Sequence, residues 1–410
     1  MKILQIHKYF YLRGGASRYF FEVSRLLQKN GHKIAYFSTK SPFNEKSKWS
    51  KYFIHTYSFE KISINNALNM FLQMLYSFEA RRNISLLLDE FKPDVVHLHS
   101  IYHQISPSII LEIKKRGIPI VQTLHDYHVV APNHTLFHNG KVCEITKKNA
   151  YFKAIFHKCI KNSYWASIAE TIEQYLHQFL KIYTNNVDIF ITPSTFFAKK
   201  LEEYGMRGKK IHILNNFCDS SLYVPQYKRG DYVLYFGRLS PEKGLLFLIS
   251  VAAKMPYVPF KIVGEGPQKS ELKRCVEMKG IKNIEFIEHK IGDELKNYIS
   301  NSRFVILPSE CFEIFPMSIL ESFALGKAVV ASNIGGIPEL VTNEQNGYLF
   351  NVGDSLTCVK YIDRLWKDPQ LCLNFGKSAR YNLETYFDKD IHLNKLRYIF
   401  GLILNQKKID

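Results

Sequence analysis

Short apolar runs alternate with segments of helical spacing through the first half of the chain. The run at residues 2–7 predicts a strand, and Gly14-Gly15 then leads into a helix that Gly31 ends. Further strands are predicted at 33–38, 94–99, 118–124, 187–192 and 210–214. Because strands that alternate with helices form βαβ units, this pattern predicts an α/β domain with a parallel, doubly wound sheet.

Two segments depart from this alternation. A long helical pattern runs from about residue 65 to residue 91, and an insertion with little strand character runs from Ala131 to about Ser163. Inside the insertion, residues 147–161 mix aromatic and aliphatic side chains with five lysines. The pattern fits a basic interfacial helix and an amphipathic core helix equally well, so both interpretations stay open.

The second half of the chain repeats the alternation after a polar, turn-rich stretch near residues 215–230. The tail from about Ser355 is helical in pattern throughout. New strands are predicted at 232–236, 260–263, 284–287, 304–307, 328–332 and 348–350. We therefore predict two Rossmann-like domains, with boundaries at 1–216 for the first, 217–230 for a linker, 231–385 for the second and 386–410 for a C-terminal helix.

The stretch from Ser309 to Glu339 carries the most specific chemistry in the second half. Pro308 ends the apolar run before it, and Pro316 suits the first turn of a helix, where its missing N–H has no cost. Glu313 is therefore expected in a loop and Glu321 in the following helix.

The start of that helix predicts an anion site. Free N–H groups near Met317 and Ser318 can bind an anion, and Glu313 and Glu321 can accept hydrogen bonds from hydroxyl groups beside it. An anion with hydroxyl groups on both sides describes a nucleotide sugar.

Composition and charge limit the partners and the cellular location that we expect for this protein. The formal net charge is +18, and residues 1–190 hold 25 Lys and Arg against 13 Asp and Glu, an excess of +12. This basic surface suits an anionic membrane or phosphorylated substrates, and the absence of nucleic-acid-binding motifs argues against nucleic acid as a partner. General solubility charge is the alternative. The seven scattered cysteines predict free thiols. Without an apolar stretch of membrane-spanning length we expect a cytoplasmic protein, and the basic first domain predicts peripheral attachment to the inner face of the membrane.

An ordered set of short motifs resembles glycosyltransferase family 4 across nearly the whole chain. The motifs are Gly14-Gly15, Lys29-Asn30-Gly31-His32, His125-Asp126, Pro193-Ser194, Phe236-Gly237-Arg238 with Lys243-Gly244, Gly264-Glu265-Gly266-Pro267, Pro308-Ser309, and Glu313 to Glu321 with Gly335-Gly336-Ile337-Pro338-Glu339. The resemblance implies the GT-B fold, with two Rossmann-like domains facing each other across a cleft and a C-terminal helix packing back on the first. It also implies retaining transfer of a sugar from a nucleotide diphosphate sugar to a saccharide or lipid-linked acceptor in cell-surface polysaccharide or glycolipid synthesis.

The resemblance assigns roles on the donor side of the cleft. Glu313 would bind hydroxyl groups of the donor sugar, Glu321 the ribose, and Arg238 and Lys243 the leaving diphosphate. Two fixed cations and a helix start can replace a divalent metal, so no metal or other cofactor is expected there. The expected donor-binding residues are Gly15, Arg238, Lys243, Glu313, Phe315, Pro316, Met317, Ser318 and Glu321. A surface helix acid for the carboxylates and a solvated basic turn for the two cations are the structural alternatives.

The acceptor side of the cleft is expected in the first domain. Gly14 and Gly15 allow a close backbone approach ahead of a helix, and His125-Asp126 follows a predicted strand at its carboxyl end. By resemblance His125 lies near the reacting sugar, where it would orient and stabilise rather than act as a general base. The residues expected to be catalytic are His125, Glu313, Arg238 and Lys243.

Two further sequence patterns could bind a metal, and two other functions remain possible for the chain as a whole. Asp388-Lys389-Asp390 looks like a metal-binding Asp-x-Asp but is interpreted as a helix start. Possible zinc ligands in the insertion fit no firm spacing, and they are His134, His138, Cys143, His157 and Cys159. A nucleotide-sugar epimerase and a catalytically silent nucleotide-sugar-binding protein remain alternative functions, whereas a dehydrogenase is disfavoured because the first strand lacks a following Gly-x-Gly-x-x-Gly.

Overall fold

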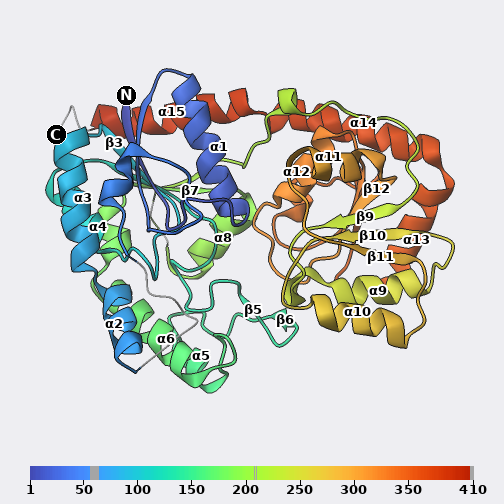
Figure 1. Ribbon diagram of the computed structural model, residues 1–410, viewed down its shortest axis with the longest axis horizontal. Helices are drawn as coiled ribbons and strands as arrows, with labels where there is room; N and C mark the ends of the chain where they lie inside the picture. The colour runs from blue at the N-terminus through green and yellow to red at the C-terminus, as the bar shows by residue number, and fades with distance from the viewer. Residues whose placement is uncertain (56–63, 207, 209, 407–410) are drawn as a thin grey trace. The chain divides into compact units, whose positions relative to one another are not determined.

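The computed structural model describes residues 1–55, 64–206, 208 and 210–406 (Figure 1). These residues form two compact units, each built around a six-stranded sheet. The first unit contains described residues from 1–136, 144–214 and 393–406, and the second contains residues 137–143 and 215–392. The domain boundaries given above stay predictions.

The sheet of the first unit is wholly parallel, as the alternating pattern predicts. Its strand order is β2-β1-β3-β4-β7-β8. Every residue of β3, β4 and β7 is buried, because helices cover both faces of such a sheet. The strands are β1 Lys2–Ile6, β2 Lys33–Phe37, β3 Val95–Leu98, β4 Ile120–Thr123, β7 Ile189–Thr192 and β8 Ile211–Ile213.

The helices of the first unit begin with α1, Gly15–Lys29, which starts at the predicted glycine pair. Asn30 follows its last turn and Gly31 takes the left-handed conformation at φ 81°, as a helix end requires. The other helical segments are η1 Lys48–Tyr52, α2 Ile64–Leu75, α3 Phe78–Phe91, α4 Ser108–Lys115, α5 Lys153–Phe156, α6 Tyr164–Phe179, α7 Ile182–Asn186 and α8 Thr195–Glu203.

The single long helix predicted near residues 65–91 is wrong, because two helices occupy this segment. Ser77 separates α2 from α3 and takes an extended conformation. Its hydroxyl group accepts a hydrogen bond from the Ala80 N–H at 3.1 Å and caps α3. Apolar spacing continues across the break, so the capping serine was the only local signal for it.

The insertion forms neither of the two helices considered for residues 147–161. Only one turn of helix, α5, is present, followed after a few residues by α6. Five residues around α5 have left-handed backbone angles that interrupt a longer helix, and they are Lys148, Asn149, Lys158, Lys161 and Asn162. A small antiparallel hairpin, β5 Phe137–His138 and β6 Lys141–Val142, lies earlier in the insertion and groups with the second unit.

The sheet of the second unit is also parallel, with the order β11-β10-β9-β12-β13-β14. All six predicted strands are present within one residue of their expected bounds. They are β9 Val233–Phe236, β10 Phe260–Val263, β11 Ile284–Ile287, β12 Phe304–Leu307, β13 Val329–Ser332 and β14 Gly347–Phe350.

The tail is helical, as predicted, and ends in α15, Lys389–Gln406, which Asp388 and Asp390 precede and open. Asp388 accepts hydrogen bonds from the backbone and side chain of Ser220, which supports its interpretation as part of a helix start. No described helix is long and apolar enough to cross a lipid bilayer. The helical segments of this unit are η2 Ser220–Leu222, η3 Pro241–Lys243, α9 Leu245–Ala253, α10 Lys269–Met278, α11 Gly292–Asn301, α12 Met317–Ala324, η4 Ile337–Glu339, α13 Ser355–Lys367 and α14 Pro369–Tyr386. Helix α15 begins in this unit, but from Leu393 on it groups with the first unit.

Gly244 joins η3 to α9 and lies against the backbone that follows β12. It has a left-handed φ of 68°, and a Cβ built on it would lie 1.9 Å from the carbonyl oxygen of Pro308. A side chain at this position would therefore push apart the segments that follow β9 and β12.

We predict that Gly244→Ala destabilises the fold far more than Gly280→Ala. Gly280 has a similar φ of 61° but no atom within 4 Å of its Cβ position. Gly280→Ala should cost about 1–2 kcal/mol from backbone strain, and Gly244→Ala roughly 1–3 kcal/mol more from the clash. Urea denaturation followed by circular dichroism measures both. Equal losses would show that the close approach at Gly244 relaxes freely.

Candidate functional site

The order of strands in the second unit fixes one place for a ligand. The chain leaves β9 toward β10 on one side and returns to β12 on the other, so the segments that follow β9 and β12 diverge. Ligands of doubly wound sheets bind at such a switch point, beyond the carboxyl ends of the strands. Arg238 and Lys243 follow β9, and Glu313 follows β12.

Lys243 and Glu313 meet at this switch point. The Lys243 Nζ lies 2.6 Å from Glu313 Oε1, and the Ser309 hydroxyl donates to the same oxygen at 2.6 Å. The two charged side chains are 24% and 11% exposed. Burial alone would lower the pKa of Lys243, but the charge of Glu313 outweighs it and holds that pKa above its usual value. The ammonium group is therefore charged at neutral pH.

Arg238 lies on the same segment but faces solvent. Its carbonyl oxygen accepts a hydrogen bond from the buried Tyr235 hydroxyl at 2.8 Å, which fixes the backbone beneath it. Within the part of the chain that the structure describes, the Arg238 guanidinium has no carboxylate partner. It is thus an available cation beside one that is already paired.

The helix start predicted after Pro316 is present, although Pro316 precedes the first helical residue, Met317, rather than occupying the first turn. The loop before it is held by its backbone: the Gly336 N–H donates to the Glu313 carbonyl at 2.7 Å. Asn216 Nδ2 donates to the Phe315 carbonyl at 3.2 Å. Met317 and Ser318 are half-buried in the first turn of α12.

Glu321 lies one turn further along α12 and is 7% exposed. The structure therefore brings Glu313, Lys243 and the start of α12 together, with Glu321 in the same helix. Arg238 follows β9 in the same segment as Lys243. In the described residues, its side chain makes no hydrogen bond or ion pair with Glu313, Lys243 or Glu321.

In the first unit, the predicted glycine pair opens α1. Gly14 precedes the helix with an extended backbone, and Gly15 is its first residue. The Ser17 hydroxyl accepts hydrogen bonds from the N–H groups of Arg13 at 2.8 Å and Gly14 at 3.1 Å. A Cβ on Gly14 would meet nothing within 4 Å, so this turn is open rather than crowded.

His125 follows β4 and belongs to a chain of buried polar side chains. Its Nε2 lies 3.0 Å from His99 Nδ1, and His99 Nε2 lies 2.9 Å from Gln5 Oε1. With Gln5 Oε1 as the acceptor, His99 donates through Nε2 and His125 donates to His99. Burial lowers the pKa of His125 to about 4, against a smaller opposing effect of Asp126. His125 is therefore neutral at neutral pH.

Asp126 is held in place by neighbours that the sequence analysis did not single out. It accepts hydrogen bonds from the Tyr102 hydroxyl and, at 3.1 Å, from the His128 N–H. Lys8 lies over the Tyr102 ring with its Nζ 3.3 Å from the ring centroid. A cavity of about 20 Å³ borders His125, Asp126, His128 and Tyr102. The sequence signal for these residues is their place after β1, β3 and β4, at the carboxyl edge of the sheet.

The possible zinc ligands of the insertion do not gather into one site. His138 and Cys143 group with the second unit, while His134, His157 and Cys159 group with the first. Among the described residues, the one set of side chains close enough to share a metal ion comes from other positions.

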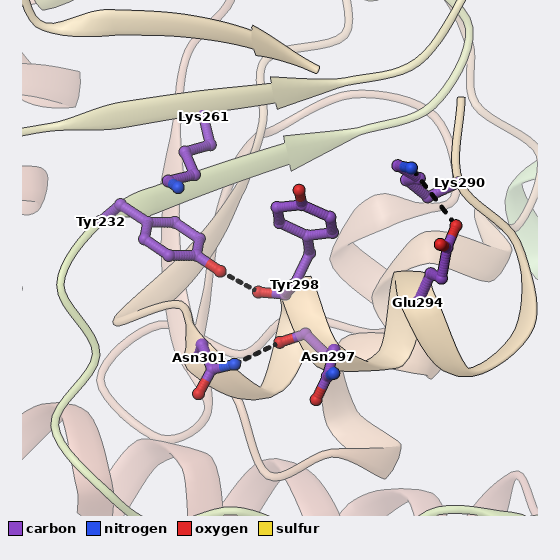
Figure 2. Close-up of a pocket in the computed structure, with 7 residues that line it drawn as sticks. All are labelled: Tyr232, Lys261, Lys290, Glu294, Asn297, Tyr298 and Asn301. Carbon is purple, nitrogen blue, oxygen red and sulfur yellow. Dashed lines mark hydrogen bonds and ion pairs between the residues drawn. The ribbon is translucent and has the colours of Figure 1, made fainter. Parts of the chain in front are cut away.

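A cavity of the second unit lies away from the switch point. It has a volume of about 420 Å³ and lies beside α11 (Figure 2). Tyr232, which lines it, precedes β9, whereas Lys243 follows β9 at the opposite end of the strand. In Figure 2 the Tyr232 hydroxyl donates to the Tyr298 carbonyl at 2.7 Å, and Lys290 pairs with Glu294 at 3.3 Å. Because this cavity lies at the end of β9 opposite to the switch point, we do not assign the function to it.

Two family models together cover most of the chain. The model described as Glycosyltransferase Family 4 matches residues 13–222, more than half of the chain. The model described as Glycosyl transferases group 1 matches residues 224–381. The chain belongs to glycosyltransferase family 4. The resemblance inferred from the ordered motifs is thereby confirmed.

Relatives and solved structures agree with this family. N-acetyl-alpha-D-glucosaminyl L-malate synthase from Bacillus anthracis is 24% identical, with 96% of each chain covered. Sulfoquinovosyl transferase from Arabidopsis thaliana is 26% identical over 72% of this chain, and the match spans 54% of that protein. Sucrose-phosphate synthase from Thermosynechococcus elongatus has a TM-score of 0.73 at 18% identity, with 98% of both chains covered. HepE from Anabaena, solved with UDP-glucose, has a TM-score of 0.69 at 18% identity, over 98% of this chain and 99% of that one. The GT-B fold is confirmed for this family 4 glycosyltransferase.

We predict that the family 4 enzyme loses stability in mild acid partly through His125. The folded state keeps His125 neutral down to about pH 4, whereas the unfolded chain takes up a proton below about pH 6.5. The contribution of His125 to the free energy of unfolding is therefore fully present above pH 6.5, and it is lost as the pH falls from 6.5 toward 4. His125→Gln, which keeps a donor, should reduce the loss between pH 8 and pH 5 by about 2 kcal/mol.

Urea denaturation at pH 8 and pH 5 measures this difference. His157→Gln is the matched control, because His157 is exposed and meets water in both states. An acid loss that is the same in His125→Gln and in the unmodified protein would contradict the prediction.

Proposed function

We propose that this protein is a retaining glycosyltransferase that moves a sugar from a nucleotide diphosphate sugar to a saccharide or lipid-linked saccharide. Cell-surface polysaccharide or glycolipid synthesis is the setting that fits such acceptors. The observation that carries the proposal is the pair Lys243 and Glu313 at the switch point of the second sheet, next to the start of α12.

The donor side follows from charge and hydrogen-bonding capacity. Arg238 and Lys243 offer two cations to a leaving diphosphate, and the first N–H groups of α12 add a partial positive charge. Glu313 offers an acceptor to sugar hydroxyl groups, and Glu321 offers one to the ribose. These fixed charges stabilise the developing negative charge electrostatically, so the proposal needs no divalent metal at this position.

The acceptor side is assigned to the first unit. Because neutral His125 donates through Nε2 to His99, its Nδ1 can accept a hydrogen bond from a hydroxyl group beside the reacting sugar without adding a charge. In the retaining reaction the bond between the sugar and the diphosphate breaks and the acceptor hydroxyl attacks from the same face. The departing phosphate oxygen takes the hydroxyl proton, and His125 and Asp126 orient the groups. Gly14, which has open space at its Cβ position, and the neighbouring Gly15 are assigned to the acceptor or the diphosphate.

The relatives guide the choice of donor. The solved HepE complexes are described with UDP and UDP-glucose, and the other relatives named above include transferases of sugars. Uridine diphosphate sugars are therefore the first donors to test, before guanosine and adenosine diphosphate sugars.

We predict that Glu313→Gln retains the fold but loses about 10²–10³-fold in turnover, because a charged acceptor aimed at the sugar is replaced by a neutral amide. The assay measures donor consumption and glycosylated product with a panel of nucleotide sugars and saccharide or lipid-linked acceptors. Glu277→Gln is the matched control, since Glu277 is an exposed acid on α10.

The same assay separates the alternatives. Conversion of a nucleotide sugar with no acceptor present would indicate an epimerase. Donor binding without turnover would indicate a silent binding protein. If Glu313→Gln turned over donor as fast as the unmodified protein, the role given to this carboxylate would be wrong.

We also propose that the first unit attaches to an anionic membrane surface. The outward face of α6 is apolar: Trp165 is 82% exposed and Phe179 83%, with Ile172 and Tyr175 between them. Phe156 on α5 is 73% exposed. Lysines surround these side chains at positions 153, 158 and 181, and all three are exposed. Aromatic side chains among lysines suit the boundary between lipid headgroups and acyl chains.

We predict that the protein floats with vesicles containing phosphatidylglycerol at low salt and much less at high salt, because the lysine contribution is screened. The double variant Trp165→Ala with Phe179→Ala should lower vesicle binding at least about tenfold, from the apolar area removed. Tyr398→Ala is the control, since Tyr398 is 65% exposed elsewhere in the first unit. The absence of flotation at low salt, or equal flotation of the double variant, would contradict this proposal.

A further inference from the structure

Helix α6 has the opposite polarity to an ordinary surface helix. Its buried positions are all polar: Ser167, Thr171, Glu173, Gln174 and His177. Glutamates and a histidine at positions 170, 173 and 177 share the inward face at helical spacing. A charged face turned inward requires partners, because an unpaired buried carboxylate is costly.

The partners come from the loops that follow β3 and β4. His103 lies in the first loop and His128 in the second, both beyond the carboxyl ends of the strands. The His103 Nε2 is 2.8 Å from the Glu170 carboxylate and 3.5 Å from Glu173 Oε2. The His128 Nε2 is 3.8 Å from Glu173 Oε1. Two imidazoles and two carboxylates from three separate segments thus converge.

Glu173 is the member of this group that lacks a partner. Its side chain is completely buried, and neither carboxylate oxygen has a hydrogen-bond donor. Burial, followed by the charge of Glu170, raises the pKa of Glu173 well above its usual value. A buried acid that faces two histidines without a hydrogen bond to either has to be neutralised, by its own proton or by a bound cation.

His177 points the lone pair of one ring nitrogen toward the Glu173 carboxylate. Its Nε2 lies 3.2 Å from the Leu75 carbonyl, which can only accept, so this nitrogen carries the proton. The other nitrogen, Nδ1, then faces Glu173 Oε1 at 3.8 Å as an acceptor. Acceptor faces acceptor here, which a proton or a cation between them would relieve.

Lys8 does not supply the charge through a direct pair. Its ammonium group lies over the Tyr102 ring, and no carboxylate of the described chain lies within 4 Å of it. Burial lowers the pKa of Lys8 to about 8, although Asp126 and Glu170 act against that effect. With a pKa of about 8 the ammonium group is mostly charged at pH 7, so Lys8 adds a nearby positive charge but no direct ion pair to the two glutamates.

We propose that His103, His128, Glu170 and Glu173 form a binding site for one divalent transition-metal cation, with Zn²⁺ as the probe. One ligand atom from each residue lies within 4.8 Å of the others. Ligand atoms around a zinc ion at about 2.1 Å lie about 3.4 Å apart, so modest side-chain rotations would close the set. Two carboxylates would neutralise the ion, and two imidazoles with two oxygens suit zinc better than calcium or magnesium.

Such an ion would hold structural elements in position and would take no part in the transfer reaction itself. It would fasten α6 to the loops after β3 and β4, and the second of these loops carries His125 and Asp126. His128 also stacks on Tyr102, with ring centroids 4.0 Å apart, and Tyr102 donates to Asp126. The proposed ion is thus one side chain removed from the predicted acceptor-side residues, and it is independent of the donor-side proposal above.

The test uses the full chain, purified with a chelator and dialysed, and then titrated with Co²⁺ and Zn²⁺. We expect one equivalent of either ion, visible cobalt absorption typical of nitrogen and oxygen ligands, and a higher melting temperature with Zn²⁺. Glu173→Gln, which is nearly isosteric, should lower the metal affinity at least about tenfold, and His103→Asn should do the same. Because two variants and the unmodified protein are all measured, a folding defect in one variant does not decide the result.

Control variants separate this site from the thiols of the insertion. Cys143→Ser with Cys159→Ser should leave the cobalt spectrum and affinity unchanged. A sulfur-to-cobalt charge-transfer band that disappears in this double variant would overturn the proposal. So would the absence of saturable metal binding, or metal binding that Glu173→Gln leaves intact. Absent metal binding together with an equal or higher melting temperature for Glu173→Gln would mean that Glu173 is simply protonated.

Discussion

Parallel strands all end at the same edge of a sheet, and this constraint organises both units. In the second unit the segments after β9 and β12 leave the sheet in opposite directions, and Lys243 and Glu313 reach each other across that point at 2.6 Å. The approach requires the absence of a side chain at Gly244, whose Cβ would strike the Pro308 carbonyl. The ion pair therefore depends on backbone packing that glycine makes possible, and the packing depends on the strand order.

The carboxyl edges of the two sheets differ in charge. The second unit keeps a permanent cation at its edge, because the charge of Glu313 outweighs the burial of Lys243. The first unit gathers histidines whose charged forms burial disfavours, among them His7, His99 and His125. One edge is thus suited to an anion such as a diphosphate, and the other presents neutral hydrogen-bonding groups.

Much of this arrangement was predictable from local sequence signals. Pro308 and Pro316 indicate where β12 ends and α12 begins, so the sequence predicts Glu313 in the loop between them. The alternation of strands and helices indicated both sheets and their parallel pairing. The break at Ser77 was missed because the apolar spacing runs on through it, and the one-turn helix α5 was missed because left-handed residues such as Lys148 carry no apolar signal.

The cluster around Glu173 could not be predicted, since it depends on which face of α6 turns inward. Trp165, Ile172 and Phe179 form an apolar stripe that ordinarily marks the buried side of a helix. The structure places the polar stripe inward instead, where it faces His103 and His128, two residues that are distant in sequence. Side-chain periodicity gives the stripe, but long-range contacts decide its direction.

This inverted helix also affects how the protein should respond to temperature. The heat capacity of unfolding comes mainly from apolar surface that becomes hydrated when the chain unfolds. The apolar stripe of α6 is already hydrated in the folded state, since Trp165 and Phe179 are more than four-fifths exposed. Unfolding α6 therefore exposes polar groups that lower the heat capacity, and this helix contributes less curvature to the stability curve than a helix of ordinary polarity. In calorimetry, the apolar stripe of α6 should add little to the heat-capacity change of unfolding. It should contribute to the heat-capacity change of binding when a membrane or another partner covers it.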